Sequence, residues 1–314
     1  MVEPGELVFL SGGTGTPKLL QGFRALLSDE LLTVIGNTGD DEEFYGLLVS
    51  PDIDTLLYLF AGLLDENKYW GVKGDSFYTN DFLRSLGEEA WFQLGDKDLA
   101  LHLVRKKLLL EGKNATKVTS ELSRRLHIQA TILPMTNDAI RTVMITKVNN
   151  RKLTFQEYTV KTHEKFAVKK VLYQGSEKAE ITPECSKALS NSKMIIIGPS
   201  NPITSIGPML AVKGFKESLM ESPATIVAIS PIEDKRAFSG PAAQLLHELG
   251  MEASPVSIAK LYQEFLDIFI LSETDRTLAE EIHALGIKTI CTDINLGSKK
   301  RRNDITRLIL NELK

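Results

Sequence analysis

Residues 7–18 read LVFLSGGTGTPK, an apolar run that ends in a cluster of glycines. The run predicts a buried strand, and the glycines allow a tight turn whose backbone N–H groups point at an anion. Pro17 suits a first helical position, and Lys18 adds a positive charge one turn into the helix. The stretch therefore predicts a strand, a phosphate-binding turn and a helix, although glycines also serve ordinary strand-to-helix turns.

Six further short runs are rich in aliphatic and β-branched side chains. They cover residues 31–35, 130–133, 194–197, 225–229, 268–271 and 288–291. Strands that are apolar nearly throughout are typical of a sheet buried on both faces, which is parallel and covered by helices. The sequence therefore predicts an α/β fold.

Three segments interrupt or close this pattern. Residues 65–125 are helical and polar and predict an insertion, whereas residues 141–173 alternate and predict a small antiparallel hairpin region. Residues 303–313 predict a closing helix capped by Asn303. We expect a single domain that spans residues 1–314, with its core at about 1–64 and 126–314.

The composition excludes several classes of protein. A net charge of -4 over 314 residues gives no electrostatic reason to expect nucleic acid as a partner. Cys185 and Cys291 lie far apart, so they suggest neither a disulfide framework nor a thiolate metal site, and a reducing cytoplasm is expected. No apolar stretch approaches the roughly 20 residues of a membrane-spanning helix.

A second turn resembles the first in its position after a strand. Residues 198–208, GPSNPITSIGP, follow the apolar run at 194–197, and two prolines fix the backbone around Ser200 and Asn201. Because the carboxyl ends of parallel strands meet at one edge of a sheet, both turns are expected to face the same ligand.

Acidic side chains are the other half of the predicted site. Asp40 and Asp41 follow the second strand, while Asp52 and Asp54 occupy a helix start. Carboxylates near a diphosphate are typical ligands of Mg²⁺. Acids in a first helical turn are also favoured by the helix dipole, and residues two apart do not share a face, so Asp52 and Asp54 need not serve one ion.

The turn does not fit the common nucleotide-binding motifs. A kinase-like P-loop needs wider spacing between its glycines and a Lys-Ser/Thr pair, but Leu19 follows Lys18 here. A nicotinamide site needs a third glycine where Lys18 stands, and an acid at the second strand end, which reads Gly36-Asn37-Thr38. A dehydrogenase is therefore a minor alternative.

Four separated motifs together resemble the CofD family. The motifs are residues 11–20, 50–55, 94–98 and 198–208. The resemblance implies a Rossmann-like fold and a Mg²⁺-dependent transferase of coenzyme F420 biosynthesis. Its acceptor would be the deazaflavin Fo (7,8-didemethyl-8-hydroxy-5-deazariboflavin). Its donor would be lactyl-2-diphospho-5'-guanosine, or a phosphoenolpyruvyl analogue, and the products would be F420-0 and GMP.

The resemblance also implies roles for individual residues. Asp54 and Lys97 match positions that contact Fo, and Trp70 belongs to aromatic residues near which Fo would lie. Asp54 and Asp52 are the catalytic candidates, and Asp40, Asp41, Asp52 and Asp54 are the candidate metal ligands. The residues expected to hold the guanosine diphosphate portion are Gly12, Gly13, Thr14, Gly15, Lys18, Asn37, Thr38, Gly198, Pro199, Ser200, Asn201 and Ser205.

An alternative from another class stays open. A sister group of regulatory proteins shares the Gly-Gly-Thr-Gly turn and the fold, and resembles a sensor of nucleotide sugars rather than an enzyme. In either case we expect a cytoplasmic protein that binds small molecules, most commonly as a homodimer.

Overall fold

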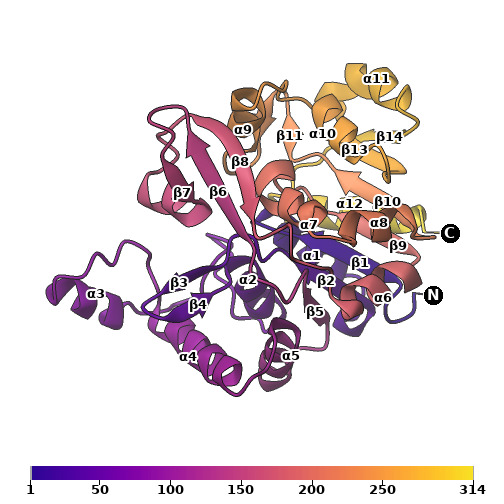
Figure 1. The fold of residues 1–314 in the computed structure, drawn as a ribbon. Coiled ribbons are helices and arrows are strands. Elements are labelled where there is room, and N and C mark those ends of the chain that lie inside the picture. Colours follow the sequence, from indigo (N-terminus) through magenta and orange to yellow (C-terminus); the bar gives the residue numbers. More distant parts are fainter. Residues whose placement is uncertain (1, 314) are drawn as a thin grey trace.

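A seven-stranded sheet lies at the centre of the computed structural model, which describes residues 2–313 (Figure 1). Its strands are β1 (Leu7–Ser11), β2 (Leu32–Gly36), β5 (Thr131–Pro134), β9 (Met194–Ile197), β10 (Thr225–Ile229), β13 (Ile268–Ser272) and β14 (Lys288–Thr292). Their order is β14-β13-β10-β9-β1-β2-β5, and all neighbours are parallel. Each strand lies at one of the seven predicted apolar runs, so the predicted α/β fold is confirmed.

Successive residues of each central strand enter different cores. In β1, Val8 and Leu10 belong to one buried cluster, while Leu7 and Phe9 belong to another on the opposite face. All five residues of β1 are buried. The side chains of a strand alternate between the two faces, so a strand that is buried on both must be apolar at every position.

Helices cover both faces of the sheet. One core includes residues of α1 (Gly15–Arg24), α2 (Pro51–Phe60), α4 (Asp96–Leu110), α5 (Ala115–Arg125) and α12 (Lys299–Asn311). The other includes residues of α6 (Pro183–Asn191), α7 (Gly207–Ala211), α8 (Phe215–Met220), α9 (Ala242–Glu248), α10 (Pro255–Tyr262) and α11 (Ala279–His283). Within residues 2–313, none of the helices has the length and apolar content needed to cross a membrane.

Smaller elements lie outside the main sheet. The insertion adds α3 (Tyr78–Ser85), which projects from the body in Figure 1. The predicted hairpin, β6 (Arg141–Thr146) and β7 (Lys152–Thr154), belongs to a three-stranded antiparallel sheet with β8 (Val168–Gln174). Two short hairpins were not predicted, because strands of two or three residues leave no readable alternation. They are β3 (Glu42–Phe44) with β4 (Leu47–Val49), and β11 (Ile232–Glu233) with β12 (Arg236–Ala237).

Single helical turns complete the chain. Two are 3₁₀ turns, η1 (Asp29–Leu31) and η4 (Glu273–Leu278), and two are π-helical, η2 (Glu157–Lys161) and η3 (Pro202–Ile206). Such π-helical turns are rare and occur frequently at functional sites.

The closing helix begins earlier than predicted. Its first residue is Lys299 and its cap is Ser298, whose side chain accepts a hydrogen bond from the backbone N–H of Arg301 at 3.3 Å. Asn303 therefore lies inside the helix, and the prediction that it caps the helix is wrong. A run of four basic residues opposes the dipole at a helix start, but exposure to solvent weakens this repulsion and the serine cap offsets it.

Candidate active site

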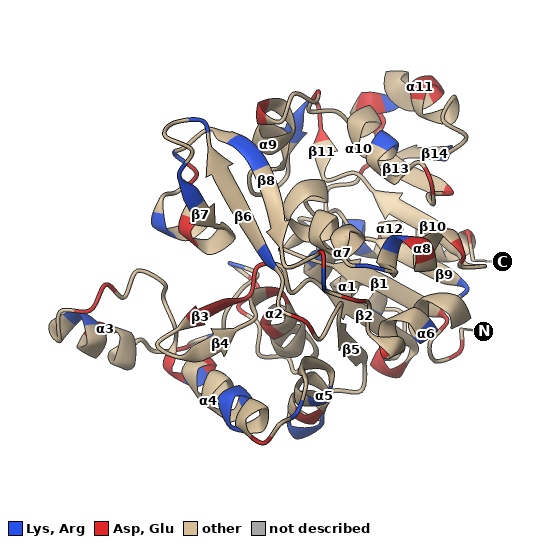
Figure 2. Cartoon of the chain, viewed as in Figure 1, with Lys and Arg blue, Asp and Glu red and all other residues tan. Residues whose placement is uncertain are grey.

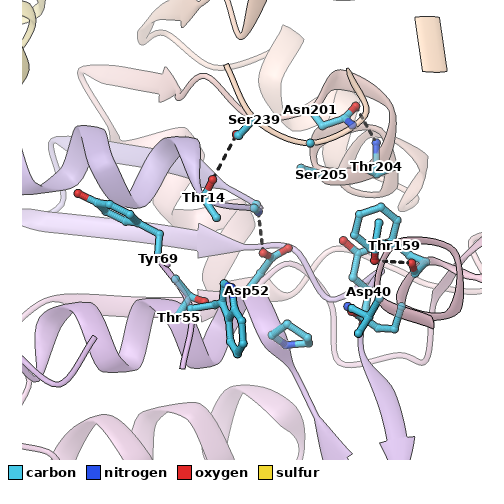
Figure 3. Close-up of a pocket in the computed structure, with 18 of the residues that line it drawn as sticks. Thr14, Asp40, Asp52, Thr55, Tyr69, Thr159, Asn201, Thr204, Ser205 and Ser239 are labelled. Atoms are coloured by element: carbon cyan, nitrogen blue, oxygen red, sulfur yellow. Dashed lines mark hydrogen bonds between the residues drawn. The ribbon is translucent and has the colours of Figure 1, made fainter. Parts of the chain in front are cut away.

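A cavity of about 940 Å³ lies beyond the carboxyl ends of β1, β2 and β9 (Figure 3). Thirteen predicted site residues line it, namely Gly12, Gly13, Thr14, Gly15, Lys18, Asp40, Asp52, Asp54, Trp70, Pro199, Ser200, Asn201 and Ser205. Five others do not line it, namely Asn37, Thr38, Asp41, Lys97 and Gly198. The parallel sheet thus brings both predicted turns and three of the four predicted acids to one space.

The turns after β1 and β9 are packed directly against each other. The Oγ1 of Thr16 lies 2.8 Å from the Oγ of Ser200, and both hydroxyls are buried. A Cβ on Gly15 would collide with the carbonyl oxygen of Pro199, and a Cβ on Gly198 would collide with the side chain of Thr16. Close backbone approach therefore requires these two glycines, and Gly198 serves packing rather than the cavity surface.

The N-terminus of α1 faces the cavity, as a phosphate site requires. The helix begins at Gly15, so Pro17 is its third residue rather than its first, still within the turn where a missing N–H costs no helical hydrogen bond. The ammonium of Lys18 lies 4.9 Å from the ring centre of Tyr69. Burial, and then the charge of Arg302, lower the pKa of Lys18. An anion in the cavity would offset both effects.

Asp40 and Asp52 form a pair of neighbouring carboxylates. The side-chain amide of Asn37 donates to the Oδ2 of Asp40 at 3.1 Å and to the Oδ2 of Asp52 at 2.9 Å. The backbone N–H of Gly13 donates to the other oxygen of Asp52 at 2.6 Å (Figure 3). Asn37 therefore orients the two acids from behind instead of touching the cavity, and the pair lies directly beside the turn after β1.

Burial gives this pair of acids unusual proton affinity. It raises the pKa of Asp52 to about 6, and burial together with the nearby Asp52 raises the pKa of Asp40 well above its usual range. Two carboxylates so placed favour the arrival of positive charge, because a cation relieves both the desolvation and the mutual repulsion.

Two atoms beside the cavity lack hydrogen-bond partners within residues 2–313. They are the Oδ1 of Asp40 and the Nδ2 of Asn201, and both are buried. The buried hydroxyl of Thr142 approaches the Asp40 carboxylate and lowers its pKa, but it makes no hydrogen bond of good geometry with the Oδ1. The Oδ1 of Asn201 is already engaged, since it accepts from the backbone N–H groups of Ile203 and Thr204 at the start of η3. A free carboxylate oxygen suits a cation and a free amide N–H suits an anion, so the cavity offers complementary partners to a cation-bound diphosphate.

Asp54 faces away from Asp52, as their helical spacing predicts. Its carboxylate is paired with the guanidinium of Arg105 on α4, and it also accepts the backbone N–H of Ser50 at 3.2 Å. Both side chains of the pair are about 5% exposed. Asp54 therefore reaches the cavity with most of its lone pairs occupied and is held apart from the Asp40 and Asp52 pair.

Asp41 is turned into the protein. The hydroxyl of Ser50 donates to it at 2.5 Å, and burial raises the pKa of Asp41 to about 7. Its carboxylate does not line the cavity, so it is the poorest placed of the four candidate metal ligands. Figure 2 shows the acidic ribbon that contains these residues, running through β3 toward the start of α2.

Lys97 and Trp70 were both predicted to contact the acceptor, but only Trp70 lines the cavity. Lys97 is exposed, and its ammonium donates to the carbonyl of Gly74 at 3.3 Å, outside the cavity. Trp70 lies at the cavity rim with 46% of its surface exposed. Its neighbour Tyr69 is buried and donates its hydroxyl to Gln21, so Tyr69 is a core anchor. The ring of Trp70 is half-exposed and has the ammonium of Lys68 4.9 Å from its centre.

Two further walls were missed by sequence reasoning. One contains Trp91 and Phe92, which pack with Phe44, and the other is η2 with the residues around it. Lys161 of η2 forms an ion pair with Glu89 at 2.9 Å and lies 5.5 Å from the ring centre of Trp91, so the two walls contact each other. The sequence held only a weak signal for the first wall, a concentration of aromatic residues in a polar insertion, whereas η2 lies in the hairpin region at 141–173.

Comparison with known proteins agrees with this geometry. The profile of a family described as 2-phospho-L-lactate transferase CofD matches residues 7–308. Curated relatives named 2-phospho-L-lactate transferase include one from Methanosarcina mazei, 37% identical over 304 residues, which are 97% of this chain and 99% of that protein. The one from Methanospirillum hungatei is 39% identical over 302 residues, which are 96% of this chain and 100% of that protein.

A solved structure shares the fold at lower sequence identity. The protein BH3568 from Bacillus halodurans superposes with a TM-score of 0.63 at 17% identity, covering 98% of this chain and 100% of that chain. At this identity the likeness concerns the fold alone.

Proposed function

Because the chain belongs to the CofD family of 2-phospho-L-lactate transferases, we propose that it transfers the 2-phospholactyl group of lactyl-2-diphospho-5'-guanosine to the ribityl hydroxyl of Fo. The products are F420-0 and GMP. The observation that carries the proposal is the meeting, in one cavity, of a phosphate-binding turn, a pair of neighbouring carboxylates and a separate carboxylate on the adjacent helical face.

The nucleotide end of the donor is assigned to the two packed turns. Backbone N–H groups at the start of α1, the ammonium of Lys18 and the free amide of Asn201 supply donors to the diphosphate. Ser200 stays occupied by Thr16, so its part is to fix the turn.

Asp40 and Asp52 would hold Mg²⁺. They fit, because the buried Oδ1 of Asp40 makes no well-formed hydrogen bond, with only the hydroxyl of Thr142 near that carboxylate, and because Asn37 aligns both carboxylates. Within residues 2–313 no cluster of three or more His, Cys, Asp or Glu side chains could hold a metal ion, so phosphate oxygens and waters would complete the coordination. When bound, the ion supplies positive charge against the diphosphate.

The reaction is an attack of an alcohol on phosphorus. The ribityl oxygen forms a bond to the phosphorus that carries the lactyl group, the bond from that phosphorus to the bridging oxygen breaks, and GMP leaves with the electron pair. Phosphoryl transfer depends mostly on positioning and charge neutralisation. Asp54, with one lone-pair direction left, accepts a hydrogen bond from the ribityl hydroxyl and orients the nucleophile. The proton released as the new bond forms passes to solvent or to the phosphate of the departing GMP.

The test is a reaction of the purified chain with Fo, Mg²⁺ and either the lactyl or the phosphoenolpyruvyl donor, followed by chromatography with mass detection. GMP and an F420-0-type product from one donor would support the proposal and identify the acid. Binding of GDP without product from either donor would instead favour the nucleotide-binding regulatory class. Light scattering on the same preparation tests the expected homodimer.

A further inference from the structure

A polar network extends from Asp54 into the protein, and its other members have no part in the roles assigned above. Three polar residues of α4, Asp98, His102 and Arg105, are spaced by four and three positions and so lie on one helical face. They meet Asp54 and Tyr58 of α2, which are four residues apart. His102 is fully buried and Arg105 is 4% exposed.

The network has a defined direction of hydrogen bonding. Arg105 is a donor only, so its contact of 3.0 Å with the Nδ1 of His102 makes that nitrogen an acceptor. The proton of a neutral His102 then resides on Nε2, 3.3 Å from the Oδ1 of Asp98, although the angle is poor for a hydrogen bond. Tyr58 donates its hydroxyl to the same oxygen.

Asp98 ends this network at the cavity. Its Oδ1 is held by Tyr58, whereas its Oδ2 has no hydrogen-bond donor within residues 2–313. Asp98 and Tyr58 both line the cavity, next to Asp54. Burial and the carboxylates of Asp54 and Asp98 raise the pKa of Tyr58, so its hydroxyl stays protonated and remains a donor.

Asp96 and Lys97, the other charged residues of the motif at 94–98, bind groups outside the cavity. Asp96 accepts from Ser76 at 2.6 Å and from two backbone N–H groups at the start of α3. Lys97 points outward to Gly74. Among Asp96, Lys97 and Asp98, therefore, only Asp98 presents a group to the cavity.

We propose that Asp98 and Tyr58 bind hydroxyl groups of the acceptor's polyol chain beside Asp54, and that His102 and Arg105 are positioning residues for the two carboxylates. This inference rests on the proposed function and names contacts for its acceptor. A polyol is the fitting ligand, since its hydroxyls can donate to the free Oδ2 of Asp98 and to the oxygen of the Tyr58 hydroxyl, whose own proton is held by Asp98. The spacing of Asp54 and Tyr58 by one helical turn would serve neighbouring hydroxyls of one chain.

The test measures binding of Fo and of GDP separately, by calorimetry, with steady-state kinetics on the same variants. Asp98→Asn is expected to weaken Fo binding by about ten- to a hundredfold and Tyr58→Phe by about two- to tenfold, in line with the loss of a charged and a neutral hydrogen bond. GDP affinity stays close to wild type, because the packed turns assigned to the nucleotide do not involve these residues, and the loss of Fo affinity appears in kcat/KM.

Asp81→Asn is the matched control, because Asp81 is an exposed acid of the same insertion whose partner is Arg84. It should leave both affinities unchanged. An Fo analogue without the ribityl chain identifies the contact, since the penalty of Asp98→Asn should vanish with it. A penalty that persists would place Asp98 against the ring and overturn the assignment to the polyol.

The positioning role of His102 is tested by two substitutions. Gln retains an acceptor for Arg105 and a donor toward Asp98, so His102→Gln should keep Fo affinity within about threefold, whereas His102→Leu should lose it without losing GDP binding. Equal effects of both substitutions would refute a positioning role. If wild type binds no Fo, the proposed function fails; if wild type binds Fo and Asp98→Asn and Tyr58→Phe bind it as tightly, only this inference fails.

Discussion

Asp54 has a structural role in its buried ion pair with Arg105 and a proposed role in orienting the acceptor hydroxyl, and the two roles can be tested separately. In Asp54→Asn the guanidinium of Arg105 stays buried but loses its countercharge. The new amide cannot satisfy it, because both oxygens of Asp54 accept from Arg105, so the NH₂ group would face a donor of Arg105 in either orientation. Removing one partner of such a pair costs about 3–5 kcal/mol. Loss of turnover in this variant alone would therefore not prove a catalytic role.

The expected change in melting temperature follows from the size of the protein. A chain of 314 residues has an unfolding entropy of about 0.7 kcal/mol/K, so Asp54→Asn should lower the Tm by about 5–8 °C. In the double variant with Arg105→Met the unpaired guanidinium is gone. We expect its free energy of unfolding to exceed the additive value by about 2 kcal/mol, within the usual range of coupling between contacting residues.

The assay is a double-mutant cycle of thermal or denaturant unfolding, with product formation and GDP binding measured on all four proteins. GDP binding should persist in every variant, because the packed turns do not involve this pair. The double variant should regain stability and remain inactive. Additive effects on stability would refute the buried pairing, and return of activity with stability would show that Asp54 acts only through structure.

Three further predictions follow from other parts of the site. Asp52→Asn should raise the Mg²⁺ concentration for half-maximal activity at least about tenfold, and an unchanged Mg²⁺ titration would remove Asp52 from the metal site. Burial raises the pKa of the Asp41 carboxyl to about 7, so the folded protein binds the carboxyl proton more tightly than the unfolded chain does. The stabilisation that this proton gives is present at low pH and is lost as the pH rises through about 7. Asp41→Asn should therefore raise the Tm at pH 8 and lose that advantage toward pH 4, and a pH-independent difference would contradict the burial argument. Gly15→Ala should destabilise the protein by about 1–3 kcal/mol and weaken GDP binding, because the new Cβ meets the carbonyl of Pro199; an unchanged Tm would show that the two turns can separate.

The sheet was predictable from sequence because helices cover both of its faces and bury most of its strands. The inner strands are buried on both faces and must be apolar throughout, so they were visible as short aliphatic runs between polar segments. The edge strands β5 and β14 are more exposed but keep enough aliphatic residues to be recognised. The parallel arrangement then places all strand ends together, so the turns after β1 and β9 could be assigned to one site before any contact was known. The hairpin of β3 and β4 escaped because its strands have only three residues each.

The partners of the acids were not predictable in the same way. The pairing of Asp54 with Arg105 spans 51 positions and joins two helices, and nothing in the local pattern around Arg105 marks it as buried. Asn37 was expected to touch the nucleotide, but it orients Asp40 and Asp52 from within the protein. Residue types and their order indicate which groups approach the site, whereas tertiary packing decides which of them face the ligand.

The start of α2 carries two carboxylates, Asp52 and Asp54, that are proposed to act on different substrates, the donor and the acceptor. Asp52 and Asp54 are two residues apart, so they leave the helix on different sides, and each is fixed by a distant element. Asp52 is tied to Gly13 at the phosphate turn, and Asp54 is tied to Arg105 on α4. A single rigid turn of helix thereby sets the separation between the proposed donor and acceptor positions. A movement of α2 toward either side would misplace both carboxylates at once, so the contacts that hold Asp52 and Asp54 also hold the reacting groups in register.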